Sequence, residues 1–219
     1  MSRVMILAIL CFLMVGTAEV YSAIQPPVQS QGDSSKVVNL QIDKERSVVK
    51  WRGTEMRGAD SHEGILKLSD GVLKLENGVL VSGYFVADMH SIEVTDIPKS
   101  DPVPRRYLTE HLESEDFFHV EKYPTARFEI TRTEDSGGVS LMITGNLSIR
   151  DVIKPVSFKA YKTINDSELV YRASFTIDRF EWNVSYHGSY WERISSIIDN
   201  NFVDAEMSIN VRLVVSSVE

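Results

Sequence analysis

Alternation of apolar and polar residues constrains the fold of this chain more than any other feature. From Val139 to Ile149 every second residue is apolar or glycine, and similar stretches recur along most of the chain. A period of two is typical of β-strands that bury one face only. Because a large antiparallel sheet loses its exposed edges by closing on itself, the pattern predicts an all-β antiparallel barrel.

The rows that we predict to face inward mix bulky and small residues. The small ones are Gly83, Ala87, Gly145, Ala160, Ala173 and Ala205. We expect them to leave space on the inner wall, so that the barrel holds a cavity for a long apolar molecule. The alternative is a barrel filled by its own side chains, which is the usual role of aromatic and aliphatic rows.

Alternation also selects the candidate ligand-binding residues. The predicted wall residues are Phe85, Met89, Phe128, Ile143, Phe158, Tyr171, Phe175 and Met207. A ligand head group would be met at the mouth of the barrel by His62, His111, Asp88 or Trp182.

Turn dipeptides divide the predicted strands. Asp70-Gly71 and Asn77-Gly78 are typical of type I′ hairpins, whose two central residues need positive φ. They predict strands over 65–69, 72–76 and 79–89. After a proline-rich stretch, the spacing over residues 105–115 becomes helical, with Tyr107, Leu108, His111 and Leu112 near one face.

Further strands follow the predicted helix. Two short strands also precede the meander, which is the run of predicted strands over 65–89. Residues 186–199 are predicted to form an irregular insertion before the last strand. The predicted strands outside the meander are 38–42, 47–53, those that begin at Thr125 and end at Ile149, 154–162, 168–178 and 205–215.

The first residues have the three parts of a secretory signal peptide. Arg3 is followed by an unbroken apolar run over 4–15 and then by the small residues Gly16, Ala18 and Ser22. Cleavage after Ala18 or Ser22 fits, and we prefer Ser22. The domain prediction is therefore a signal peptide (1–22), a flexible leader (23–36) and a barrel (37–219). The apolar run is too short for a stable membrane span, so we expect a periplasmic or secreted protein, with an uncleaved anchor as the alternative.

Charge and cysteine content exclude several classes of function. The formal net charge of −8 disfavours nucleic acid and anionic membrane surfaces as partners. The single cysteine, Cys11, lies in the segment that we expect to be removed. The mature protein is therefore predicted to have no disulfide and no thiolate chemistry.

Histidines and carboxylates give weak indications of chemistry. The five histidines lack the spacing of zinc hydrolases, so we predict no metal and no cofactor. Asp88, Glu93 and Asp96 lie close together in the sequence, and acidic residues at strand ends usually fix turns. Two alternatives to a carrier stay open: an enzyme that acts on a small hydrophobic or lipid substrate with Asp88 and His111 as acid and base, and an envelope stress-response protein without a ligand.

Seven sequence blocks in this order resemble the YceI-like family. They are VKWRG (49–53), HEG (62–64), GYFVADMHSI (83–92), LTEHLESEDFF (108–118), YPTARF (123–128), ITGNLSIRDV (143–152) and IDRFEW (177–182). The resemblance implies an eight-stranded antiparallel lipocalin-like barrel with a short helical insertion. It also implies a protein that binds or carries a polyisoprenoid or similar lipid, with quinones and their precursors among the candidates, and it leaves a homodimer open.

Overall fold

The computed structural model describes residues 36–55, 60–135, 138–165, 168–185 and 203–217. The predicted signal peptide, almost all of the leader and the predicted insertion at 186–199 lie outside these residues. The strands are β1 (Val37–Ile42), β2 (Val48–Glu55), β3 (Asp60–Leu66), β4 (Leu68–Glu76), β5 (Val79–Asp88), β6 (Glu93–Val94), β7 (Thr125–Asp135), β8 (Ser140–Ile149), β9 (Val152–Asn165), β10 (Glu168–Asp178) and β11 (Val203–Ser217). The helices are α1 (Pro102–Glu113) and the 3₁₀ turns η1 (Met89–Ser91) and η2 (Arg179–Trp182).

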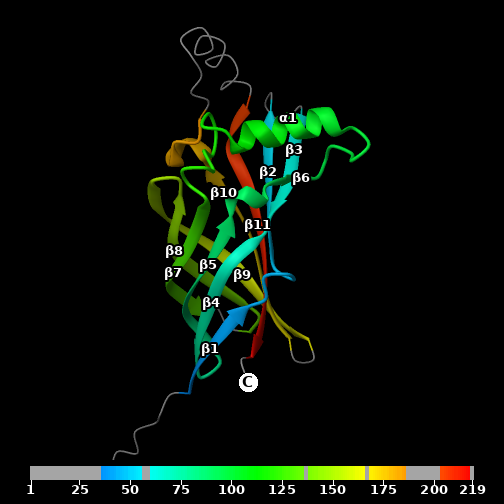
Figure 1. The fold of residues 1–219 in the computed structure, drawn as a ribbon. Coiled ribbons are helices and arrows are strands. Elements are labelled where there is room, and N and C mark those ends of the chain that lie inside the picture. Colours follow the sequence, from blue (N-terminus) through cyan, green and yellow to red (C-terminus); the bar gives the residue numbers. More distant parts are fainter. Residues whose placement is uncertain (1–35, 56–59, 136–137, 166–167, 186–202, 218–219) are drawn as a thin grey trace, which may run out of the picture. The chain divides into compact units, whose positions relative to one another are not determined.

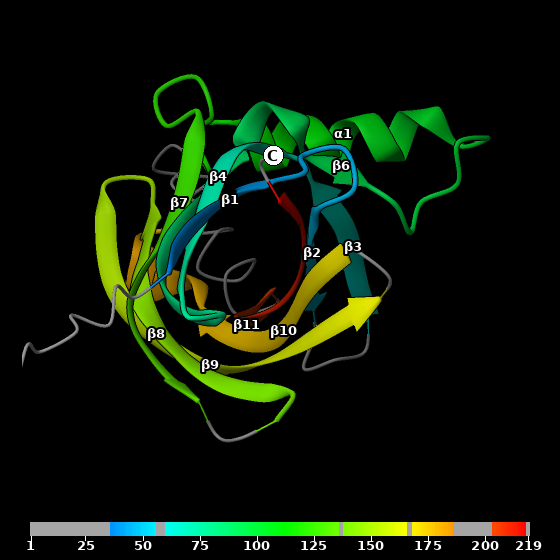
Figure 2. The ribbon, with the colours of Figure 1, turned by 90° about the horizontal axis from the view of Figure 1, so that it is seen from below.

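The sheet closes because two pairs of strands act as single long strands. Both β1 and β2 pair antiparallel with β11, so they run in the same direction and form two halves of one strand. Only Lys67 separates β3 from β4, and these pair with β2 and β1 respectively. If β1 with β2 and β3 with β4 are each counted as one strand, every strand pairs with its neighbours in sequence. The last strand, β11, pairs with the first and closes the barrel (Figures 1 and 2). The predicted closed eight-stranded antiparallel barrel is confirmed.

Polar side chains stabilise the kink between β1 and β2. The Asp43 carboxylate accepts hydrogen bonds from the backbone N–H groups of Glu45 and Arg46, both at 3.1 Å. Ser47 is buried, and its hydroxyl accepts a bond from the Val214 N–H at 2.9 Å. These bonds satisfy backbone groups that the kink leaves unpaired, so the long strand can bend and still pair with β11 on both sides of the kink.

One predicted hairpin is confirmed and the other is wrong. Asn77 and Gly78 have φ values of 52° and 80° and connect β4 to β5. Asp70 and Gly71, in contrast, lie inside β4. A β-carbon at position 71 would lie 2.5 Å from Cδ1 of Ile42, so this glycine provides room for a neighbouring side chain and not for a turn.

Alternation over 79–89 predicts that the odd-numbered residues, from Val79 onward, face inward, and this prediction is wrong at the first residues of β5. A register shift between Lys74 and Leu75 reverses the alternation at the start of β5. Leu80 is therefore buried, whereas Val79 is 42% exposed. From Phe85 onward the predicted row points into the core as expected.

The predicted helix exists but begins three residues earlier, at Pro102. Proline is tolerated in the first turn of a helix, where its missing N–H would have no intrahelical partner. Leu112 is buried, but Tyr107 is 63% exposed and does not share the buried face. The helix lies across the end of β2 and β3 (Figure 1). Within the described part of the chain, no helix combines the length and the apolar character of a membrane span.

Candidate ligand-binding site

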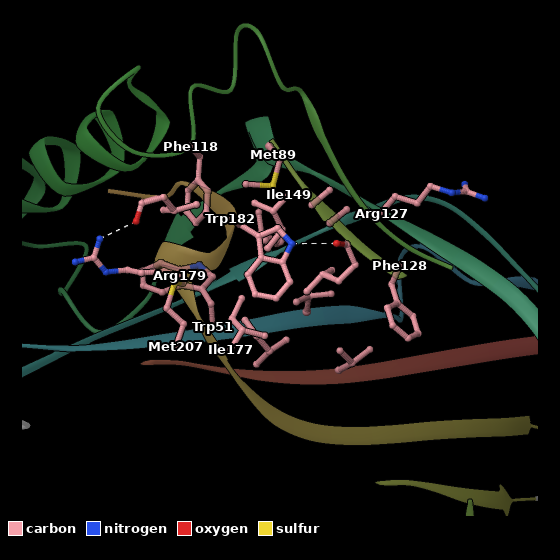
Figure 3. Close-up of a pocket in the computed structure, with 18 of the residues that line it drawn as sticks. Trp51, Met89, Phe118, Arg127, Phe128, Ile149, Ile177, Arg179, Trp182 and Met207 are labelled. Atoms are coloured by element: carbon pink, nitrogen blue, oxygen red, sulfur yellow. Dashed lines mark hydrogen bonds between the residues drawn. The ribbon is translucent and has the colours of Figure 1, made fainter. Parts of the chain in front are cut away.

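An apolar cavity of about 80 Å³ lies inside the barrel at the end near α1. We call it the upper cavity (Figure 3). Among its lining residues are five of the predicted wall residues, Phe85, Met89, Phe128, Phe175 and Met207. These side chains come from four strands and η1, so closure of the barrel is what brings them together.

Trp182 projects into the upper cavity from η2 (Figure 3). The carboxylate of Asp178 caps this turn by accepting a hydrogen bond from the Phe180 N–H at 2.9 Å. The indole Nε1 donates to the carbonyl of Leu147 at 3.0 Å, and the side chain is only 1% exposed. Trp182 is thus a fixed part of the apolar wall and does not face solvent as a mouth residue would.

A second cavity of about 70 Å³ lies under α1, and most of its wall is apolar. We call it the polar chamber because His62, His111, Arg179 and Asp204 bring polar groups to it. Trp51, Arg179 and Met207 line both the polar chamber and the upper cavity. These three shared residues mean that the two spaces adjoin, so that a wholly apolar cavity lies next to one that also carries polar groups.

Arg179 is buried at the border of these two spaces, with 1% exposure. Its Nε donates to the Asp204 carbonyl at 3.2 Å and its Nη1 to the Val184 carbonyl at 2.8 Å. Burial lowers the pKa of the guanidinium, an effect that the neighbouring Asp178 partly opposes. Sequence reasoning missed this residue, although Arg179 continues the odd-numbered inward row of 169–177.

His62, which lines the polar chamber, forms a hydrogen bond with the carboxylate of Asp96. Its Nδ1 lies 2.7 Å from Oδ2 of Asp96, whose Oδ1 accepts a bond from the Glu63 N–H at 3.0 Å. Burial acts to raise the pKa of Asp96, but the hydrogen bonds from His62 and Glu63 outweigh it and the pKa is lowered. The second histidine of the chamber, His111, contacts the ring of Phe117 at a centroid distance of 5.6 Å.

Asp88 is placed away from these cavities. Its carboxylate accepts a hydrogen bond from the His90 N–H at 3.0 Å and thereby caps η1. Of the cavities described here, Asp88 lines none and His111 lines only the polar chamber. The structure therefore does not bring this pair to one site. Among the described residues, no three His, Cys, Asp or Glu side chains gather around a position for a metal ion.

The remaining predicted wall residues, Ile143, Phe158 and Tyr171, line a lower cavity of about 30 Å³. Phe85 and Phe128 line this cavity as well as the upper one. Burial raises the pKa of Tyr171 to about 12. The predicted wall is therefore divided between two spaces.

The expectation that small residues hold the interior open is wrong at Gly145. A β-carbon there would lie 2.4 Å from Cζ of Phe128, so the ring already fills the space. Gly64 is covered in the same way by the indole of Trp51. The upper cavity is also smaller than the ~300–1,000 Å³ typical of ligand pockets. A long guest would need side chains to move.

Curated relatives match part of this chain in sequence. A UPF0312 protein of Shewanella denitrificans is 43% identical over 68 residues, which cover 30% of this chain and 35% of that protein. A UPF0312 protein of Pseudomonas putida is 44% identical over 50 residues, covering 23% of this chain and 26% of that protein. The chain thus matches about a third or less of the length of these curated relatives.

Two solved structures resemble the barrel. Burkholderia cenocepacia BcnA superposes with a TM-score of 0.64 at 22% identity, covering 79% of this chain and 98% of that one. A polyisoprenoid binding domain from Saccharophagus degradans, implicated in plant cell wall breakdown, superposes with a TM-score of 0.57 at 10% identity, covering 84% and 100%. Residues 40–215 match the family model described as YceI-like domain, and this chain therefore belongs to the YceI-like domain family.

Proposed function

We propose that this protein binds or carries an isoprenoid-type lipid, with its apolar chain in the upper cavity and its polar head in the polar chamber. The observation that carries the proposal is the common border at Trp51, Arg179 and Met207, which joins a wholly apolar space to one that also carries polar groups. A ligand with both characters, such as a prenyl alcohol or a prenylated quinone, matches this order of surfaces. The protein acts as a non-catalytic container.

The energetics favour an apolar guest. Removing apolar surface from water contributes roughly 25 cal/mol per Å², and the upper cavity has an apolar wall. Room for a chain must come from repacking, for which Met89 and Met207 are suited because unbranched thioether side chains adapt their shape. The resemblance in fold to the Saccharophagus domain, which is described as polyisoprenoid binding, supports the same ligand class.

An enzymatic role for Asp88 and His111 has less support. A general acid and a general base must both reach the reacting atoms. The Asp88 carboxylate instead caps η1, whereas His111 lies in the polar chamber.

Native mass spectrometry of the full-length protein, purified from its own host, tests the proposal. We expect one retained lipid per chain. Met207→Trp places a larger side chain in the upper cavity and should abolish retention, whereas Met142→Trp changes an exposed methionine of β8 and should not. A protein that retains no lipid and takes up no added prenyl alcohol would be the filled barrel of the alternative interpretation. Equal retention in both variants would also contradict the proposed site.

We also propose that residues 1–22 are a cleaved signal peptide and that the protein is periplasmic or secreted. The Arg3 start, the apolar run and the small residues that follow support this proposal. N-terminal sequencing of the protein from an envelope fraction should find Ala23, or Glu19 if cleavage follows Ala18. An intact Met1 in that fraction would favour the uncleaved anchor.

A further inference from the structure

The barrel has an incomplete seam between β9 and β10. Their paired residues run from Asn165 with Glu168 to Ala160 with Ala173. Beyond Ala160 and Ala173, β9 pairs only with β8, and β10 pairs only with β11, among the described residues. The two strands therefore separate in the half of the seam that leads to η2.

Two aromatic rings close this half of the seam on the inside. Phe158 and Phe175 are the next inward residues after Ala160 and Ala173. Their rings stack with centroids 4.3 Å apart and an interplanar angle of 5°. Side-chain stacking therefore joins two strands that have no backbone pairing at this level.

The stack continues across the interior as a band of four rings, which we call the aromatic partition. Its centroid distances are 5.5 Å from Phe85 to Phe128, 5.2 Å from Phe128 to Phe158 and 4.3 Å from Phe158 to Phe175. The missing side chain of Gly145 lets the Phe128 ring cross β8 to reach Phe158. Phe85 and Phe128 each line both the upper and the lower cavity, so the partition lies between them.

We propose that the aromatic partition sets the maximum length of the bound chain by separating the lower cavity from the upper one. Phe158 and Phe175 determine this limit because their stacked rings close the part of the seam where β9 and β10 are not paired. The wild-type protein accepts a short prenyl chain in the upper cavity, and loss of the Phe158–Phe175 stack joins the two cavities and admits a longer one. This inference rests on the proposed function.

Prenyl alcohols of increasing length test the inference by competition, with the full chain and native mass spectrometry as the readout. The probes are farnesol, geranylgeraniol and a polyprenol of eight isoprene units. We expect the wild type to prefer the shorter alcohols. Phe158→Ala, Phe175→Ala and the double variant should bind the longest alcohol about tenfold tighter or more, since two further buried methylene groups account for that factor.

Phe118→Ala is the matched control. Phe118 lines the upper cavity but does not belong to the partition, so its removal enlarges that cavity without joining it to the lower one. It should leave the length preference unchanged. Phe158→Leu and Phe175→Leu keep an apolar side chain and serve if an alanine variant does not fold; they should relax the preference in the same direction.

The outcomes separate this inference from the proposed function. A wild type that binds all three alcohols equally overturns the length limit and leaves lipid binding intact. Variants that bind with the wild-type preference also overturn it. A wild type that binds none of the alcohols contradicts the proposed function and with it the length limit.

Discussion

The ring of Phe128 covers Gly145 on the neighbouring strand. A β-carbon at position 145 would lie 2.4 Å from Phe128 Cζ and 2.5 Å from the carbonyl oxygen of Glu129. The glycine therefore makes room for a neighbour's ring and leaves no space for a guest. The same relation holds between Trp51 and Gly64, which lie directly opposite each other on β2 and β3.

Gly145→Ala should destabilise the fold. The new methyl group would overlap the Phe128 ring and a backbone carbonyl, and overpacking of this kind costs about 1–3 kcal/mol. Gly53→Ala is the control because a β-carbon there meets nothing within 4 Å. Urea unfolding measures both. Equal stability of the two variants would mean that the Phe128 ring moves aside without cost.

Trp182→Ala should lower the free energy of unfolding by about 3–5 kcal/mol, because a fully buried indole leaves a large cavity. Trp182→Phe keeps an aromatic ring but loses the hydrogen bond to the Leu147 carbonyl, which should cost about 0.5–1.5 kcal/mol beyond the change in packing. Thermal or urea unfolding distinguishes the two. A Trp182→Ala variant as stable as the wild type would contradict the prediction that packing of the Trp182 side chain stabilises the fold.

Acid should reduce the contribution of Asp96 to stability. Its pKa is lowered in the folded state from the ordinary 3.8, so the stabilisation is present above pH 3.8 and is lost as pH falls through the lowered value. Asp96→Asn should cost about 1–2 kcal/mol at neutral pH, and its difference from the wild type should shrink below pH 3.8.

Unfolding measured across this pH range checks the Asp96 prediction. His62→Ala removes one of the two hydrogen-bond donors and should give a smaller acid-dependent difference than Asp96→Asn. A pH-independent difference for Asp96→Asn would contradict the stated cause.

Alkaline pH should destabilise the protein through Tyr171. Its pKa is raised to about 12 in the folded state, so the folded chain retains a proton that the unfolded chain loses near pH 10.0. The stabilisation is complete below pH 10.0 and is lost as pH rises toward about 12. Tyr171→Phe should lose less stability than the wild type over that range. Tyr107→Phe, which changes an exposed tyrosine of α1, should behave like the wild type.

The candidate site was predictable where a side chain's position depends on strand alternation alone. Phe85, Phe128, Phe158 and Met207 all point into the core as predicted. Asp88 does not line the site because its carboxylate binds the backbone two residues ahead, a local contact that competes with any role in a cavity. Burial of Arg179 was not predicted, since nothing in the sequence indicates that the Val184 and Asp204 carbonyl groups accept hydrogen bonds from its side chain.

By itself the sequence determined the barrel, the Asn77–Gly78 hairpin and the presence of a helix, because alternation, turn dipeptides and helical spacing act between residues close in the chain. Tertiary structure alone decided that Gly71 stays inside a strand and that Gly145 is covered. It also decided that four rings divide the interior. The physical reason is that the space beside a small residue is filled by a side chain of a neighbouring strand, and only the register of the folded sheet decides which side chain this is.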